Sequence, residues 1–142
     1  MTIQCEIVSQ DRLVFAGEAD IVVIPGMEGQ MGILPRHTPV LTALNYGIIT
    51  VRFKGREDHF TVAGGVAEVL PDKVTVLADA AENVEEIDIE RALKARERAE
   101  ERLKLMTAAD ADRYLRVASA LRRSNLRLQA AQKYRKSTKT RY

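Results

Sequence analysis

The stretch Pro25–Leu44 reads PGMEGQMGILPRHTPVLTAL, and it decides how the first half of the chain folds. It holds three glycines, three prolines and one of the chain's two histidines between two apolar runs. Glycine permits tight turns and proline fixes a backbone dihedral, so this segment must turn several times and hold one shape. The stretch predicts tight turns that join short strands at 30–34 and around 40–44.

Strand-like runs lie on both sides of this stretch. Ile3, Cys5 and Ile7 alternate with their neighbours as in a half-buried strand, and 19–24 is nearly all apolar. Many short strands at even spacing predict an antiparallel β-sandwich over residues 1–84. Further strands are expected at 13–15, 48–53, 59–63, 66–70 and 74–78. Turns are expected at 16–17, 46–47, 54–56 and 71–73. The glycine pair at 64–65 predicts a bulge or a close backbone approach.

The composition changes after these strands. The last glycine is Gly65 and the last proline is Pro71. Residues 85–132 therefore predict a two-helix hairpin, which makes the fold class α+β. Asp88 is a plausible N-cap, and 107–110 matches a capping box that predicts a second helix near Ala108. The expected apolar stripes are 89, 92, 99, 103 and 106 on the first helix and 114, 118, 121, 125 and 128 on the second.

Alanine occupies several of these stripe positions. Burying alanine stabilises much less than burying leucine, so the helices should form readily but dock weakly on each other. Such a hairpin suits an element with more than one packing arrangement. Residues 133–142 hold five basic residues and no acid, and we expect a disordered tail or a contact arm.

Charge divides the chain in the same place. Residues 1–84 carry 6 Lys/Arg against 11 Asp/Glu, and residues 85–142 carry 16 against 9. The two halves should therefore face different partners. The single cysteine, Cys5, excludes an intrachain disulfide and is read as a small buried hydrophobe. The N-terminus lacks the pattern of a signal peptide and no apolar run is long enough to span a membrane, so we expect a soluble chain that reaches membranes through partners.

Motifs for catalysis or metal binding are missing from the sequence. It holds no phosphate-binding loop, no H-E-x-x-H and no cysteine cluster. The glycine series at 26, 29 and 32 has the wrong spacing for a phosphate loop, and His37 and His59 have no third ligand. The sequence therefore predicts a chain with no catalytic site, no catalytic cofactor and no metal.

The pattern P-G-x-E-G-x-x-G-I-L-P-x-H-x-P-x-L-T-x-L at 25–44 and the A-G-G-x-x-E-V run at 63–69 resemble the epsilon subunits of bacterial F-type ATP synthases, over about residues 1–132. The resemblance implies a non-catalytic central-stalk (rotor) subunit of a proton-driven enzyme, peripheral on the cytoplasmic face of the bacterial cell membrane. A chloroplast source shares this plan. The resemblance also implies three partners for this chain: the gamma subunit, the membrane c-ring and the catalytic alpha/beta subunits. It implies that the chain does not act as a homo-oligomer.

The resemblance also implies roles for particular residues. The turn around His37 would face the ring, which makes five residues candidate rotor contacts; the alternative is a turn cluster with no partner. The mobile helices would inhibit ATP hydrolysis by meeting an acidic surface of the beta subunit. The five candidate contacts are Glu28, Gln30, Arg36, His37 and Thr38.

A second motif lies at the start of the first helix. Residues 87–92 fit the I/L-D-x-x-R-A motif of those relatives that bind ATP as a regulatory ligand. Arginines suit phosphates and carboxylates can accept hydrogen bonds from adenine or ribose, so bound ATP would hold the hairpin closed. The alternative is a purely structural role, in which Asp88 caps the helix and Arg91 pairs with Asp88. The implied nucleotide contacts are Glu82, Ile87, Asp88, Arg91, Ala92, Arg98, Arg123 and Arg127.

Two other classes of function are alternatives. A stand-alone ATP-sensing module would bind nucleotide without joining gamma, and a nucleic-acid-binding adaptor would use the basic second half. Tyr114 and Tyr134 stand alone among the arginines and offer no aromatic platform for bases, so we expect no nucleic-acid partner.

Overall fold

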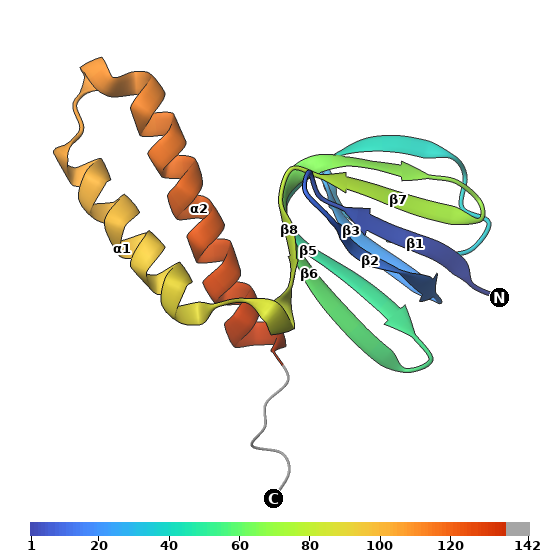
Figure 1. The fold of residues 1–142 in the computed structure, drawn as a ribbon. Helices are drawn as coiled ribbons and strands as arrows, with labels where there is room; N and C mark the ends of the chain where they lie inside the picture. The colour runs from blue at the N-terminus through green and yellow to red at the C-terminus, as the bar shows by residue number, and fades with distance from the viewer. Residues whose placement is uncertain (136–142) are drawn as a thin grey trace, which may run out of the picture. The chain divides into compact units, whose positions relative to one another are not determined.

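The structure is a computed structural model that describes residues 1–135, and the chain divides into two compact units at Asn83/Val84 (Figure 1). The first unit is built of strands and the second of helices, as the fold class α+β predicts. The strands are β1 Ile3–Val8, β2 Leu13–Ala19, β3 Ile21–Gly26, β4 Gly29–Ile33, β5 Val40–Phe53, β6 Arg56–Val69, β7 Lys73–Ala78 and β8 Ala81–Asn83. The helices are the 3-10 helix η1 Val84–Glu86, α1 Ile89–Leu105, the 3-10 helix η2 Ala108–Asp110 and α2 Ala111–Tyr134.

The strands form one hydrogen-bonded sheet that folds over on itself as a sandwich. Its order is β2-β1-β7-β6-β5-β3-β4, and β8 pairs with β6. The long hairpin of β5 and β6 pairs in one register along its whole length, from Val40↔Val69 to Phe53↔Arg56. Among the described residues, the ladder between β1 and β7 is parallel, and the other ladders are antiparallel as predicted.

Large aliphatic side chains fill the interior of the sandwich. Ile7, Ile24 and Ile49 are fully buried, and the Phe60 ring lies with its centroid 5.2 Å from that of Phe15. Cys5 belongs to the same core, and burial, with a smaller effect of Glu6, raises the pKa of its thiol from 9.0 to about 12. Cys5 is therefore the buried hydrophobe that the sequence predicted, because a thiol this hard to ionise is a poor nucleophile.

Two expected turns prove to be strand interiors. Gly17 lies within β2 and Gly47 within β5, so the predicted turns at 16–17 and 46–47 are wrong. A Cβ on Gly47 would come within 2.7 Å of the Pro25 Cβ, and one on Gly17 within 3.1 Å of the Phe15 ring. These glycines make room for a neighbouring side chain rather than reverse the chain.

The Gly64-Gly65 pair does serve a close backbone approach. Both residues have positive φ, +88° and +127°, within β6. A Cβ on Gly65 would lie 2.8 Å from the Ala78 Cα, which leaves no space for a side chain where β6 passes β7. The register with β5 stays constant across this pair, so the ladder to β5 has no bulge there.

The second unit is an antiparallel helical hairpin. Asp88 caps α1 as predicted: its Oδ1 accepts the Arg91 backbone N–H at 3.1 Å. The Asp110 carboxylate accepts the backbone N–H of Thr107 at 3.2 Å, which confirms the helix start near Ala108. Arg135 joins the end of α2 to the segment before α1, because its Nη2 donates to the carbonyl oxygens of Glu85 (2.9 Å) and Ile87 (2.7 Å).

Small side chains occupy the buried positions of α1 and α2. On α1 the buried residues are Ala92 and Ala99, as expected, whereas Ile89 is 39% exposed. The predicted stripe of α2 is out of phase, because Tyr114 is 47% exposed and its other members are only half-buried. The buried residues of α2 are Ser124, Ala130 and Ala131.

The second helix also runs further than expected. It ends at Tyr134 rather than at 132, and its cap residue Arg135 donates its backbone N–H to the Ala131 carbonyl oxygen. Three residues of the predicted tail are therefore structured. The remainder of that tail, 136–142, lies outside the described residues.

Candidate functional site

The predicted turn around His37 is held in one shape by local hydrogen bonds. The Arg36 backbone N–H donates to the Pro71 carbonyl oxygen at 2.7 Å, and Arg36 takes a positive φ of 66°, which is uncommon outside glycine. The His37 Nδ1 donates to the Thr38 carbonyl oxygen at 2.7 Å. The side chains of Arg36 and Thr38 are exposed and that of His37 is half-buried. The turn therefore offers a cation and an imidazole on a fixed backbone.

The other two candidate contacts lie elsewhere in the sandwich. Glu28 occupies the turn between β3 and β4, and Gln30 follows at the start of β4, paired with Pro25. The strand β4 separates both from the His37 turn by roughly 13 Å, given the rise of an extended strand. The structure thus gathers Arg36, His37 and Thr38 and leaves Glu28 and Gln30 as a second, distant group.

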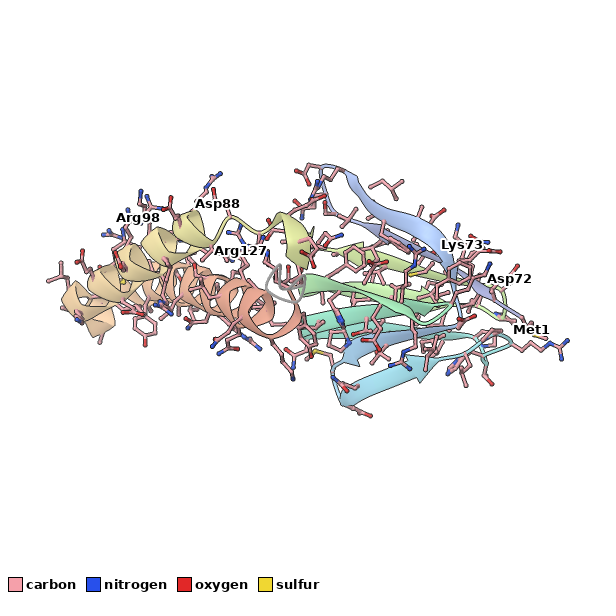
Figure 2. All side chains as sticks on the ribbon, turned by 90° about the horizontal axis from the view of Figure 1, so that it is seen from below. Met1, Asp72, Lys73, Asp88, Arg98 and Arg127 are labelled. Carbon is pink, nitrogen blue, oxygen red and sulfur yellow. The ribbon has the colours of Figure 1, made fainter. Side chains whose placement is uncertain are left out.

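The His37 turn belongs to one end of the sandwich. Figure 2 shows Met1, Asp72 and Lys73 at that end, and the Gln4 backbone N–H donates to the Asp72 carbonyl oxygen. Two exposed leucines flank the Arg36–Pro71 hydrogen bond in sequence: Leu34 is 56% exposed and Leu70 is 38% exposed. Apolar side chains and the cation of Arg36 therefore share this end.

A row of apolar side chains crosses the outer face of the sheet. Directly paired positions on five neighbouring strands are all apolar, and three of them are substantially exposed: Leu13 by 59%, Leu77 by 53% and Val66 by 40%. At about 4.8 Å between strands, the row is roughly 19 Å long. We call it the apolar row; its members are Ala43, Val66, Leu77, Val8 and Leu13 on β5, β6, β7, β1 and β2.

The predicted nucleotide contacts fall in both units. Glu82 lies in β8, where its backbone carbonyl accepts the Thr61 hydroxyl at 3.4 Å. The other seven lie in the helical unit, where Ile87 and Ala92 are buried and Asp88 and Arg91 are exposed at the start of α1. Figure 2 labels Asp88 at the start of α1, Arg98 on α1 and Arg127 on α2.

Helical spacing arranges the arginines in two stripes. Steps of seven and four residues place Arg91, Arg98 and Arg102 on one side of α1. Steps of three, seven and four residues likewise align Arg113, Arg116, Arg123 and Arg127 along α2. The predicted contacts Arg91, Arg98, Arg123 and Arg127 belong to these stripes, which fits a site for phosphate groups along the hairpin. Asp88 uses one oxygen as a helix cap and retains the other as an acceptor.

Near the closed end of the hairpin the two stripes meet in a cavity of about 470 Å³, which we call the tip groove. Arginines from both helices line it, and the small Ala95 and Ala120 leave it open between them. Sequence reasoning placed Arg98 in the nucleotide site and offered Arg113 and Arg116 as contacts for an acidic protein surface, but it did not single out Arg102 or bring the four together. Their helical spacing was visible in the sequence; the approach of α1 to α2 was not. The arginines of the groove are Arg98, Arg102, Arg113 and Arg116.

The histidines make local contacts. The His59 Nδ1 lies 3.1 Å from the Thr50 hydroxyl and its Nε2 3.3 Å from a Glu57 oxygen. No group of three or more potential metal-ligating side chains occurs among residues 1–135. None of the helices in these same residues is both long enough and apolar enough to cross a membrane.

Two family models cover nearly the whole chain. Residues 2–84 match the ATP synthase delta/epsilon chain beta-sandwich domain, and residues 85–132 match the delta/epsilon long alpha-helix domain. The chain is 44% identical over 140 residues to the ATP synthase epsilon chain of Dehalococcoides mccartyi strain CBDB1, covering 94% of this chain and 95% of the relative. It is 44% identical over 131 residues to the ATP synthase epsilon chain of Moorella thermoacetica, and this match covers 92% of this chain and 96% of the relative.

Two solved structures contain chains of similar fold. A chain of the Euglena gracilis mitochondrial ATP synthase, described as OSCP/F1/c-ring in rotational state 1, superposes with a TM-score of 0.65 at 25% identity and covers 92% of this chain and 78% of its own. A second chain comes from the Tetrahymena thermophila mitochondrial ATP synthase, described as central stalk/c-ring. It superposes with a TM-score of 0.56 at 13% identity and covers 92% of this chain and 97% of its own. The second likeness concerns the fold alone.

Proposed function

The chain belongs to the delta/epsilon family of ATP synthase subunits, and we propose that it is a non-catalytic rotor subunit in the central stalk of a proton-driven ATP synthase. The match of residues 2–84 and 85–132 to the two domains of this family, in the same order, carries the proposal. The sandwich would join the gamma subunit to the membrane c-ring, so the chain would sit peripherally on the cytoplasmic face of the bacterial membrane.

The sandwich offers a separate surface for each of these partners. The end that carries Arg36, His37 and Leu34 combines a fixed backbone with exposed cationic and apolar side chains, and we assign it to the c-ring. The apolar row lies on the face of the sheet, and an exposed row of this kind is typical of a protein interface. We assign it to gamma, the other stalk neighbour.

Two aspartate substitutions test this assignment on purified complexes. Leu77→Asp should weaken capture of the gamma subunit and spare the c-ring, because a charge would be desolvated against an apolar partner. Leu34→Asp should weaken binding to the c-ring and spare capture of gamma, so each variant serves as the control for the other. Both leucines are more than half exposed, so the sandwich should stay folded. Gamma binding at wild-type affinity by Leu77→Asp would refute the role of the apolar row.

The helical hairpin would act as a brake on ATP hydrolysis. The second half of the chain carries a net charge of +7, which complements the acidic surface expected on the beta subunit. Buried alanines and a serine hold α1 and α2 together, so opening the hairpin costs little apolar contact. Truncation after Asn83 should raise the ATP hydrolysis rate of the reconstituted complex. An unchanged rate would remove the brake from the proposal.

ATP would be the regulatory ligand that keeps the hairpin closed. The Asp88–Arg91 helix start and the arginines at 98, 123 and 127 would hold it, and its binding would stabilise the closed form by RT ln(1 + [L]/Kd). Calorimetric titration of the full chain with ATP should show saturable binding that Arg91→Ala abolishes. An absence of heat at millimolar ATP would leave the rotor assignment standing and reduce Asp88 to a helix cap.

A further inference from the structure

We propose that the tip groove is a second anion site of the hairpin, which takes a small polyvalent phosphate. Four guanidinium groups, two from each helix, line a cavity of about 470 Å³. That volume lies within the range of about 300–1,000 Å³ that is usual for small-ligand pockets. Arg98 also belongs to the nucleotide contacts assigned above, whereas the other three arginines of the groove lie outside them.

The arginines of the groove lack protein counter-charges. Within residues 1–135, no ion pair or side-chain hydrogen bond is formed by Arg98, Arg102, Arg113 or Arg116. Two nearby carboxylates have other partners, since Glu100 pairs with Arg96 at 3.7 Å and Asp110 accepts the backbone N–H of Thr107.

Like charges at this spacing repel each other. Arg98 and Arg102 are four residues apart on α1, and Arg113 and Arg116 are three apart on α2. The hairpin adds repulsion between the helices, because it brings both pairs to one cavity. A bound polyanion would neutralise this charge and connect α1 to α2, so its binding should stabilise the hairpin.

The shape and chemistry of the groove favour phosphate over a protein surface. Guanidinium groups bind phosphate oxygens in pairs, and arginines on both walls can reach several phosphate groups at once. A flat acidic protein surface would reach the rim of the groove but would not fill the space above Ala95 and Ala120. The ligand class is therefore a linear or clustered polyphosphate, free or as part of a nucleotide.

Inorganic tripolyphosphate is the appropriate probe, because it carries the charge of a triphosphate without a base or ribose. Calorimetric titration of the full chain at low salt should show saturable binding. Arg102→Gln and Arg113→Gln should each weaken it about tenfold or more, the loss expected for a charge-assisted hydrogen bond. Lys104→Gln removes the same charge from an exposed position of α1 outside the groove and should change affinity less than twofold.

The Arg91→Gln variant separates this site from the proposed ATP site. If both exist, Arg91→Gln loses ATP binding but keeps tripolyphosphate binding. Loss of tripolyphosphate binding in Arg91→Gln, with Arg102→Gln and Arg113→Gln unaffected, would overturn the tip groove as a site. Binding of poly-glutamate without any binding of tripolyphosphate would also overturn it and would assign the groove to an acidic protein.

Discussion

The two units of this protein are stabilised in different ways. The sandwich buries isoleucine, valine and phenylalanine completely, whereas the buried positions of α1 and α2 are alanines and a serine. A fully buried Leu, Ile or Phe contributes about 1.5–3 kcal/mol, and alanine contributes far less. The difference predicts a rigid anchor joined to a hairpin that opens at low cost.

The largest expected effect concerns the sandwich core. Phe60 is 1% exposed and packs against Phe15, so Phe60→Ala should lower the free energy of unfolding by about 3–5 kcal/mol. Urea denaturation followed by circular dichroism measures this loss. Leu41→Ala, at a side chain 72% exposed, is the control and should change stability by less than about 0.5 kcal/mol. Similar losses in both variants would show that the sandwich is not the close-packed unit described here.

A smaller effect tests the backbone of the same unit. Gly65→Ala places a methyl group against Ala78 at a positive φ, and the strain should cost about 3 kcal/mol. Gly29→Ala is the matched variant, since its φ is +135° but no atom lies within 4 Å, so strain alone should cost about 1 kcal/mol. Equal losses, measured in the same urea titration, would mean that the approach of β6 to β7 can relax.

These glycines also show what the sequence could and could not predict. Alternation of apolar residues correctly predicted most strands, because burial of one face leaves a local pattern. Gly17 and Gly47 looked like turns, since local propensity cannot reveal that Phe15 or Pro25 lies against them. The register that forms the apolar row depends on long-range pairing for the same reason.

The helical unit was predictable at its ends but not across its interface. Asp88 and the 107–110 capping box are local signals, and both were confirmed. The spacing of Tyr114 and its helical neighbours predicted the stripe of α2, yet close helix packing selects Ser124 and Ala131. The tip groove depends on that packing, so the sequence could not show that Arg102, Arg113 and Arg116 line one cavity with Arg98.

A bulky residue in the hairpin interface should loosen that unit alone. Ala99 is 4% exposed, and Ala99→Leu adds three carbons there, which should cost about 1–3 kcal/mol. Hydrogen exchange with mass spectrometry should show faster exchange in α1 and α2 and unchanged exchange in β1 to β7. Glu97→Leu, at an exposed position of the same helix, should leave hydrogen exchange unchanged in the helices and in the strands. Equal acceleration in the strands would contradict independent opening of the hairpin.

The smallest effect separates the structural role of Asp88 from its proposed ligand role. Without nucleotide, Asp88→Ala should destabilise α1 by about 1 kcal/mol, because the Arg91 backbone N–H loses its acceptor. Asp88→Asn keeps a capping oxygen and should restore the slow hydrogen exchange of the first turn of α1. If Asp88→Asn nevertheless binds ATP more weakly than wild type, the carboxylate charge acts on the ligand as well as on the helix. If Asp88→Asn binds ATP as wild type does, the charge of Asp88 has no role in nucleotide recognition, and the cap fully accounts for this residue.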